Sequence, residues 1–449
     1  MIQFSFIVAV ILVLYIRTWK HENIIDDSCE RSDYLRRETS EVDALLPNKQ
    51  AFYDSRRPIR VTVECILTHI ANGGVIMLIW GWKAALLYSL SPMVVHTVAW
   101  KIGAQIYGSS TLLLLVCHYF VINYGDFGLI FGALLYYSAI QCSLSALPYP
   151  LLIPLIRPMP LEGTILYILI LLLFISGNRF RSALKRRVKI HENVRIKAGR
   201  FNPKRIIIMV KVIACYIQHS LTPPWRIKGG FFVNIKNINS TRLDRHFWVS
   251  LLLDILFYSW AWIISPFMAL WHLAFILPYS GFILYGMLIA ERYQSIFIIA
   301  TCVLLSRALP HEVFIVLAAL WFYRSLLYIK IFRSNETLFR ENCYSHSETS
   351  EPYVNLASWL MERGRFNAAL AYLLMAIKLG EASSHIYADT SLCYQKCGQF
   401  TKALYYLELT LKGCPLDKIE LVKRQKRHLE DKIRQVEYHK KTLKRRGII

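Results

Sequence analysis

Residues 251–277 read LLLDILFYSWAWIISPFMALWHLAFIL, which is too apolar for an ordinary soluble helix and indicates a membrane-spanning fold class. Its break falls near Ser265-Pro266, which predicts two successive helices rather than one. Similar apolar runs recur from the N-terminus to about residue 331. The sequence therefore predicts an all-α protein with a polytopic membrane domain over residues 1–332.

The composition of the 449-residue chain supports this prediction. Hydrophobic residues make up 55% of the chain and charged residues only 18%, whereas a soluble domain carries about 25% charged residues. The mean hydropathy is +0.35. These values exclude an ordinary soluble enzyme, and they exclude a disordered chain because disorder requires low hydrophobicity. The length leaves room for one small soluble domain after the membrane domain.

The chain is strongly basic, with 53 Lys and Arg against 30 Asp and Glu and a net charge of +23. We expect these basic residues to interact with the surface of the lipid bilayer. Nucleic acid is not an expected partner, because the aromatic residues lie mostly in apolar runs rather than among basic side chains. The ten cysteines are scattered without a CxxC pair, so they are expected to be buried small residues, and no metal site is predicted.

Two polar loops carry opposite charge. Residues 17–60 form a loop with nine acids, whereas only eleven more acids occur between residues 55 and 350. Residues 179–205 carry eleven Lys and Arg and one acid, which predicts a cytoplasmic loop. With that loop inside, the chain after Ile331 lies on the non-cytoplasmic side. The side of the 17–60 loop stays open, because Arg17 and Lys20 favour the opposite orientation.

A 34-residue period appears in residues 351–415. Four positions hold the same residue type again 34 residues later, and Pro415 marks the end of the second unit. A 34-residue period with small and aromatic positions predicts two tetratricopeptide (TPR) units, each a helical hairpin. Residues 416–449 are expected to form a basic capping helix and tail. The residues expected to pack these hairpins are Tyr353, Gly364, Phe366, Ala369, Tyr387, Gly398, Phe400, Ala403 and Pro415.

Three groups of residues are candidates for chemistry. Asp26-Asp27 follows the first apolar run and suits a general base or a metal clamp, although a solvated loop has the same composition. Glu291-Arg292-Tyr293 lies between two apolar runs, where Arg292 suits a phosphate and Tyr293 suits an interfacial anchor. His69 and Asn72 lie within an apolar run, and we expect packing and hydrogen bonding there more than catalysis.

These pieces occur in an order that resembles the GT-C glycosyltransferases with C-terminal TPRs, namely the transmembrane-and-TPR O-mannosyltransferases of the endoplasmic reticulum and their bacterial relatives. The resemblance covers most of the chain. It is carried by six short motifs: Asn23-Ile24-Ile25-Asp26-Asp27, Arg56-Arg57-Pro58-Ile59, Leu67-Thr68-His69-Ile70-Ala71-Asn72, Pro92 with Val98-Ala99-Trp100 and Gly103, Ala290-Glu291-Arg292-Tyr293, and Ser334-Asn335-Glu336-Thr337-Leu338-Phe339-Arg340.

The chain departs from the family pattern at polar positions that, by the resemblance, would serve the donor phosphate or the catalytic base. The family's histidine, glutamate and arginine positions hold Ser91, His96 and Ala104, and its Lys-Glu dipeptide aligns roughly with Gln141-Cys142. These departures imply either a divergent donor or a loss of activity.

The resemblance implies a membrane glycosyltransferase that uses a polyprenyl- or dolichyl-phosphate sugar. Asp26 or Asp27 would be the catalytic base, and Arg292 and Arg57 would bind the donor phosphate. His69, Asn72, Trp100, Glu291 and Tyr293 would support the site. No cofactor is required, a divalent metal stays open, and the TPRs would hold a protein acceptor or partner.

Two other functions remain alternatives. A catalytically degenerate relative would be a membrane scaffold that recruits a partner through its TPRs. A transporter or lipid-handling protein is a third possibility, although the halves of the chain show no internal symmetry. The expected location is a multi-pass position in the endoplasmic reticulum membrane or the bacterial inner membrane, with the TPRs on the non-cytoplasmic side.

Overall fold

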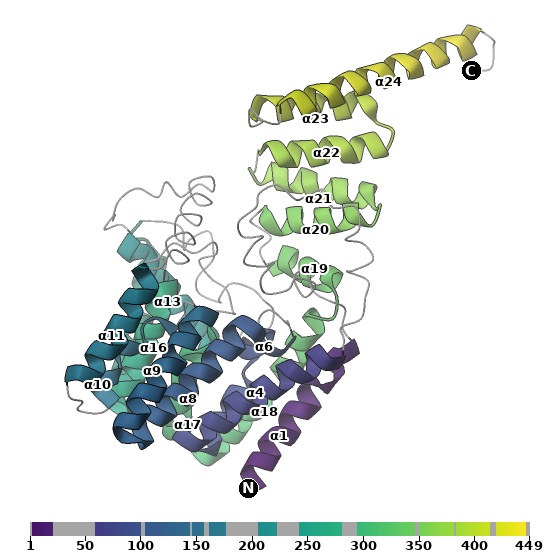
Figure 1. The fold of residues 1–449 in the computed structure, drawn as a ribbon. Coiled ribbons are helices and arrows are strands. Elements are labelled where there is room, and N and C mark those ends of the chain that lie inside the picture. The colour runs from purple at the N-terminus through teal and green to yellow at the C-terminus, as the bar shows by residue number, and fades with distance from the viewer. Residues whose placement is uncertain are drawn as a thin grey trace. The chain divides into compact units, whose positions relative to one another are not determined.

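The computed structural model describes most of the two predicted regions, and all of its regular elements are helical. It divides into two compact units, which meet in the chain at Ser334 and Asn335. The residues described are 2–20, 59–99, 104–143, 146–156, 161–176, 205–221, 242–280, 294–345, 350–380, 383–413 and 419–445. The predicted all-α class is confirmed for this part of the chain, and each unit is described by itself (Figure 1).

Unit 1 is a bundle of helices of very different lengths. The longer helices are α1 (Ile2–Tyr15), α4 (Ile59–Trp80), α5 (Trp82–Leu90), α8 (Ser109–Asn123), α9 (Gly125–Cys142), α11 (Leu161–Ser176), α13 (Arg205–Leu221), α15 (Arg245–Ile264), α16 (Pro266–Ile276), α17 (Phe297–Ala308) and α18 (His311–Ile331). The short ones are α6 (His96–Ala99), α10 (Ile153–Ile156), η1 (Ile16–Lys20), η2 (Pro92–Val94), η3 (Ala104–Gly108), η5 (Tyr149–Leu151) and η6 (Leu277–Tyr279).

Four helical segments of the described part are long and apolar enough to cross a membrane. They are Thr62–Trp80, Ile106–Asn123, Arg245–Ile264 and His311–Ile331. Large aliphatic side chains on these helices face outward, among them Leu78, Ile263 and Val316. An outer surface of this kind is costly in water and suits hydrocarbon.

The apolar stretch 251–277 is divided at the predicted break. Ser265 is the N-cap of α16, and its hydroxyl accepts a hydrogen bond of 3.4 Å from the Met268 amide. Pro266 occupies the first turn of α16, where its missing N–H costs nothing. The chain then turns back, because Phe257 and Tyr258 of α15 both contact His272 of α16. The break at Ser265-Pro266 is therefore confirmed.

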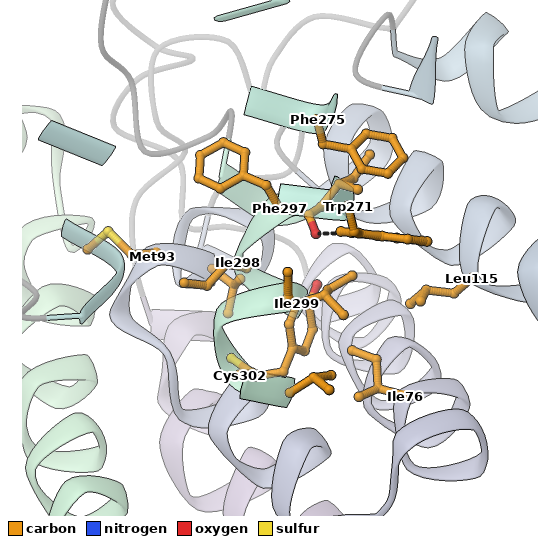
Figure 2. Close-up of a cluster of buried hydrophobic side chains, with 14 of the residues drawn as sticks. Ile76, Met93, Leu115, Trp271, Phe275, Phe297, Ile298, Ile299 and Cys302 are labelled. Atoms are coloured by element: carbon orange, nitrogen blue, oxygen red, sulfur yellow. Dashed lines mark hydrogen bonds between the residues drawn. The ribbon is translucent and has the colours of Figure 1, made fainter. Parts of the chain in front are cut away.

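Helix α17 lies at the centre of unit 1. Its residues from Phe297 to Leu304 are fully buried. Trp271 of α16 lies beside this helix, and its indole N–H donates a hydrogen bond of 3.2 Å to the Ile296 carbonyl. Figure 2 shows Ile76 and Leu115 in the same cluster as Ile299. The core therefore joins helices from both halves of unit 1.

The directions of α1 and α4 follow from their contacts. A Cβ placed on Gly74 would lie 3.1 Å from the Phe4 ring, near the start of α1. Tyr15, at the end of α1, contacts His69, which lies nearer the start of α4, with ring centroids 5.4 Å apart. Helices α1 and α4 are therefore antiparallel, as Figure 1 also shows.

Helix α18 runs in the same direction as α1. The chain reverses between α4 and α5 at Gly81, whose φ of 90° favours glycine. Two contacts show that α5 and α18 are parallel. The rings of Trp82 and Phe314, in the first turns of the two helices, have centroids 5.9 Å apart, and Ser325 of α18 is hydrogen-bonded to Leu90 at the end of α5. Unit 1 thus has one end at which α1 and α18 finish and α4 begins, and we call it the exit end.

Unit 2 is a series of helices that pack in chain order (Figure 1). They are α19 (Asn335–Ser345), α20 (Glu351–Glu362), α21 (Phe366–Lys378), α22 (Ser384–Lys396), α23 (Phe400–Gly413) and α24 (Ile419–Arg445). Gly364 and Gly398 follow α20 and α22 with φ of 71° and 75°, so each pair turns through a left-handed glycine.

The pairs α20–α21 and α22–α23 repeat the same contacts 34 residues apart. Tyr353 and Tyr372 have ring centroids 6.3 Å apart at 33°, and Tyr387 and Tyr406 have centroids 6.2 Å apart at 37°. Ala369 and Ala403 are both fully buried at the start of the second helix. Phe366 and Phe400 are the first residues of α21 and α23. The sequence period thus corresponds to a repeated helical hairpin, while Pro415 lies outside the described residues.

Candidate functional site

The candidate site residues within the described part of unit 1 are His69 and Asn72. His69 is buried between Tyr15 and Tyr88, and its Nε2 lies 3.4 Å from the Ser89 carbonyl oxygen. Its Nδ1 has no hydrogen-bond partner among the described residues. An imidazole enclosed by aromatic rings has no open face toward a substrate, so this geometry suits packing between α1, α4 and α5.

Asn72 joins α4 to the segment that precedes α8. Its side-chain amide donates a hydrogen bond of 3.1 Å to the Gly108 carbonyl, while its Oδ1 has no partner within the described ranges. The adjacent Gly73 lets α5 approach closely, since a Cβ there would lie 3.0 Å from the Ser89 hydroxyl. His69 and Asn72 therefore hold neighbouring helices together, which is the role expected for polar residues within an apolar run.

The remaining candidate residues for catalysis and donor binding lie outside the described residues, so the structure does not bring them together. They are Asp26, Asp27, Arg57, Trp100, Glu291, Arg292 and Tyr293. The chain positions that flank them are described. Segment 21–58 is preceded by η1 and followed by α4, and η1 packs on both α1 and α4. The described residues on either side of this segment therefore lie at the exit end.

The segment with Arg292 runs into a well-packed part of the bundle. Gln294 and Ser295 follow it directly and are fully buried. The Ser220 hydroxyl of α13 donates a hydrogen bond of 3.3 Å to the Gln294 Oε1. Because α17 leads to the start of α18, opposite the exit end, Gln294 lies on the exit-end side of α17. The residue that follows Tyr293 is thus anchored to α13.

Helix α15 begins at the exit end as well. Phe267, just after the end of α15, stacks against His118 at 5.7 Å, and Trp271 lies 5.8 Å from Trp80, the last residue of α4. The end of α15 therefore lies opposite the exit end. Asp244, at its start, lies about 30 Å away along the helix, at the exit end.

Asp244 forms an ion pair there with Lys211 of α13. The Lys211 Nζ lies 3.0 Å from one carboxylate oxygen and also donates a hydrogen bond of 3.4 Å to the Arg242 carbonyl. Asp244 caps α15 by accepting a 2.9 Å hydrogen bond from the Phe247 amide. Burial opposes ionisation, but the bonds from Lys211 and Phe247 and the charges of Lys211 and His246 hold the pKa of Asp244 below its ordinary value.

Sequence reasoning missed the Lys211–Asp244 pair and the Ser220–Gln294 bond. The available signal was Lys211 itself, a single cation inside the short apolar run 206–217. Its fully buried ammonium needs a partner, and Asp244 provides one. These two contacts tie α13 to the start of α15 and to the residue Gln294 before α17.

A second buried polar cluster lies near the opposite end. The His118 ring stacks between Trp80 at 5.3 Å and Phe267 at 5.7 Å, and its Nδ1 is 3.1 Å from the Tyr149 hydroxyl. All of its neighbours are aromatic or apolar, so this cluster is part of the core. No local sequence pattern marks this cluster, because its members come from four separate segments.

The positions at which the chain departs from the pattern that it resembles have local structural roles where they are described. The Ser91 hydroxyl accepts a 3.3 Å hydrogen bond from the Met93 amide and caps η2. Gln141 and Cys142 end α9. His96 and Ala104 lie in α6 and η3, and only the backbone of these two residues is described. Ser91 is thus a helix-capping residue, and this structural role does not require catalysis.

No group of three or more His, Cys, Asp or Glu side chains that could hold a metal occurs within the described ranges. No protein-family model, curated protein or solved structure matches the chain. The residues and their arrangement are therefore the basis for any proposal about function.

Proposed function

We propose that the chain is a multi-pass membrane glycosyltransferase of the GT-C type that moves a sugar from a polyprenyl- or dolichyl-phosphate donor to a hydroxyl group. The observation that carries this proposal is the direction of α1, α4 and α18. Because α1 and α18 finish at the exit end and α4 begins there, the helices on both sides of the segment with Asp26 and Asp27, and the last helix before unit 2, all reach that end.

This arrangement supports a reaction at the exit end. In it, Asp26 or Asp27 removes the proton of the acceptor hydroxyl while the hydroxyl oxygen forms a bond to the anomeric carbon of the donor sugar. The bond from that carbon to the phosphate oxygen breaks, and the lipid phosphate leaves with the electron pair. Arg292 and Arg57 neutralise the negative charge that develops on this phosphate. Such a reaction requires no cofactor.

Unit 2 supports the choice of a protein acceptor. Its two hairpins repeat the same tyrosine contacts and buried alanines, which suits a TPR-like stack that binds a peptide segment. In this proposal unit 2 and the 17–60 loop lie on the same side of the membrane. The location is the endoplasmic reticulum or bacterial inner membrane.

The test is sugar transfer by the purified full-length protein in detergent. A panel of polyprenyl-phosphate sugars is offered with a hydroxyl-bearing peptide, and Asp26→Asn and Asp27→Asn are compared with the wild type. Glu30→Gln is the matched control, since it removes one negative charge from the same segment. We expect wild-type transfer that is lost in one of the aspartate variants and kept in the control.

A membrane scaffold is the second candidate, and the Ser91 cap favours it. The position that holds histidine in the family is occupied here by Ser91, whose side chain caps a helix. A scaffold would give no transfer with any donor from folded protein, and it would tolerate Asp26→Asn. Its partner would instead be lost when exposed residues of unit 2 are changed.

A further inference from the structure

An apolar groove runs along the outside of unit 1 between α1, α5 and α18. Its volume is about 420 Å³, within the range of about 300–1,000 Å³ typical of small-molecule sites. Its lining residues recur at helical spacing, for example Trp82, Leu86 and Leu90 on α5. His311 is the one lining residue with an ionisable side chain. The groove therefore suits a hydrocarbon chain.

The groove has a buried floor and open sides. Leu86, Leu90 and Phe314 are at most 6% exposed and form the floor, whereas Phe6 and Ile315 are 54% and 52% exposed at its sides. Ala318 and Ala319 of α18 lie along the same path. Small side chains at these positions leave the space that larger ones would fill.

The length of the groove matches one leaflet of a bilayer. Along α18 its lining extends from His311 to Phe322, about 16 Å at 1.5 Å per residue. The hydrocarbon core of a bilayer is about 30 Å thick, so one leaflet contributes about 15 Å. A partner membrane-spanning helix would need a seam of about twice this length. One acyl chain of a lipid fits the observed length better.

The end of the groove at Trp82 and His311 has the residues of a membrane interface. Trp82 lies against Phe314 with ring centroids 5.9 Å apart, and the Lys83 Nζ lies 5.3 Å from the centroid of the same ring. Tryptophan and lysine are common at the headgroup level. The exposed carboxylate of Glu312 lies next to His311 but does not line the groove. Lys83 thus brings a cation to the level where a lipid phosphate would lie.

We propose that this groove binds one acyl chain of a phospholipid with an anionic headgroup, whose phosphate interacts with Lys83 and His311. The site lies in the half of unit 1 opposite the exit end, so it is separate from the proposed sugar-transfer site and does not depend on it. The bound lipid covers the apolar floor and ties α1 to α5 and α18. A partner helix and a second copy of the chain are the competing occupants.

The experiment is photo-crosslinking of the full-length protein in lipid nanodiscs. Phosphatidylglycerol or phosphatidylcholine with a diazirine in the acyl chain is the probe, and the adducts are mapped by peptide mass spectrometry. We expect adducts concentrated on α5 and α18 peptides that line the groove. One lysine near an anionic headgroup predicts about fivefold more labelling by phosphatidylglycerol than by phosphatidylcholine.

Two variants separate the groove from general lipid contact. Ala319→Phe places a ring in the groove and should reduce the groove adducts several-fold, whereas Leu320→Phe adds a ring on the same helix outside the lining and should leave them unchanged. Lys83→Gln should equalise labelling by the two lipids and keep the acyl-chain adducts. This variant keeps the test decisive if Ala319→Phe does not fold.

Three results would overturn the proposal. The first is uniform labelling of all lipid-facing helices, and the second is equal labelling by both lipids in the wild type. The third is crosslinking of the groove to a protein, either a second copy of the chain or a partner. None of these results bears on sugar transfer, which is measured separately.

Discussion

The Ser325 hydroxyl of α18 donates a hydrogen bond of 2.7 Å to the carbonyl oxygen of Leu90, 235 residues earlier in the chain. Leu90 is the last residue of α5, so its carbonyl has no partner within its own helix. Both residues are buried. An unpaired carbonyl is costly in an apolar interior, so this bond both stabilises the end of α5 and fixes the register of the two parallel helices.

Replacement of Ser325 by alanine should destabilise unit 1. The change leaves the buried Leu90 carbonyl without its partner, which should lower the free energy of unfolding by about 1–3 kcal/mol. The measurement is thermal unfolding of the full-length protein in detergent, with a lower midpoint expected. Ser138→Ala is the matched control, because the Ser138 hydroxyl donates to the Leu134 carbonyl on an exposed helix face. Equal midpoints for the two variants would contradict the role given to Ser325.

The ion pair between Lys211 and Asp244 should show strong coupling. Asp244→Ala removes both the counter-ion of a fully buried ammonium and the cap of α15. Since the carboxylate is partly exposed, we expect a loss of about 1–3 kcal/mol rather than the larger cost of a fully buried pair. Lys211→Met retains the aliphatic volume and should cost less.

A double-mutant cycle on this pair separates the ionic effect from the cap. If the pair matters, Asp244→Ala should cost much less in the Lys211→Met background than in the wild type. Additive effects would mean that Asp244 acts only as the cap of α15. The midpoint of thermal unfolding is the readout for all four proteins.

Much of the helical architecture could be predicted because its signals are local. A serine and a proline in succession end one apolar helix and begin the next at Ser265 and Pro266, whatever surrounds them. The 34-residue period likewise needs only neighbouring hairpins, and the repeated tyrosine contacts have their counterpart in the sequence.

The two polar contacts of α13 could not be predicted in the same way. Ser220 and Gln294 are 74 residues apart, and Lys211 and Asp244 are 33 residues apart. Neither bond follows from a local pattern, because it depends on how α13 packs against α15 and α17. Sequence reasoning identified His69 and Asn72 as buried polar residues, yet their partners, the carbonyls of Ser89 and Gly108, give no signal in the side-chain sequence.

The left-handed glycine after α22 should be sensitive to a β-carbon. Gly398 has φ of 75°, and no atom lies within 4 Å of the position of its Cβ. Backbone strain is therefore the main cost of Gly398→Ala, about 1–2 kcal/mol. Gly398→Asn should cost less, because asparagine adopts this conformation more readily. Hydrogen exchange of peptides from α22 and α23 measures the loss of stability in both variants. An equal loss of protection in the two variants would contradict the strain argument.

Asp389 of α22 should make unit 2 less stable as the pH rises through the weakly acidic range. Burial raises the pKa of this carboxyl to about 6, although the charge of His385 opposes the shift. An unfolded aspartate has a pKa of about 3.9, so the folded chain binds the proton more tightly between these values. The stabilisation is fully present below about pH 4 and is lost as the pH rises to about 6, with an upper bound of about 3 kcal/mol.

The isosteric change Asp389→Asn tests this linkage because it removes the titrating group. We expect the protection of α22 peptides from hydrogen exchange, corrected for the intrinsic effect of pH, to fall in the wild type between pH 4 and pH 6. The Asp389→Asn protein should show no such fall and should be the more stable of the two at pH 7. Asp431→Asn on the exposed face of α24 is the control, since that carboxylate pairs with Arg434 at the surface. A wild-type profile that stays flat over this range would show that Asp389 is solvated in the folded protein.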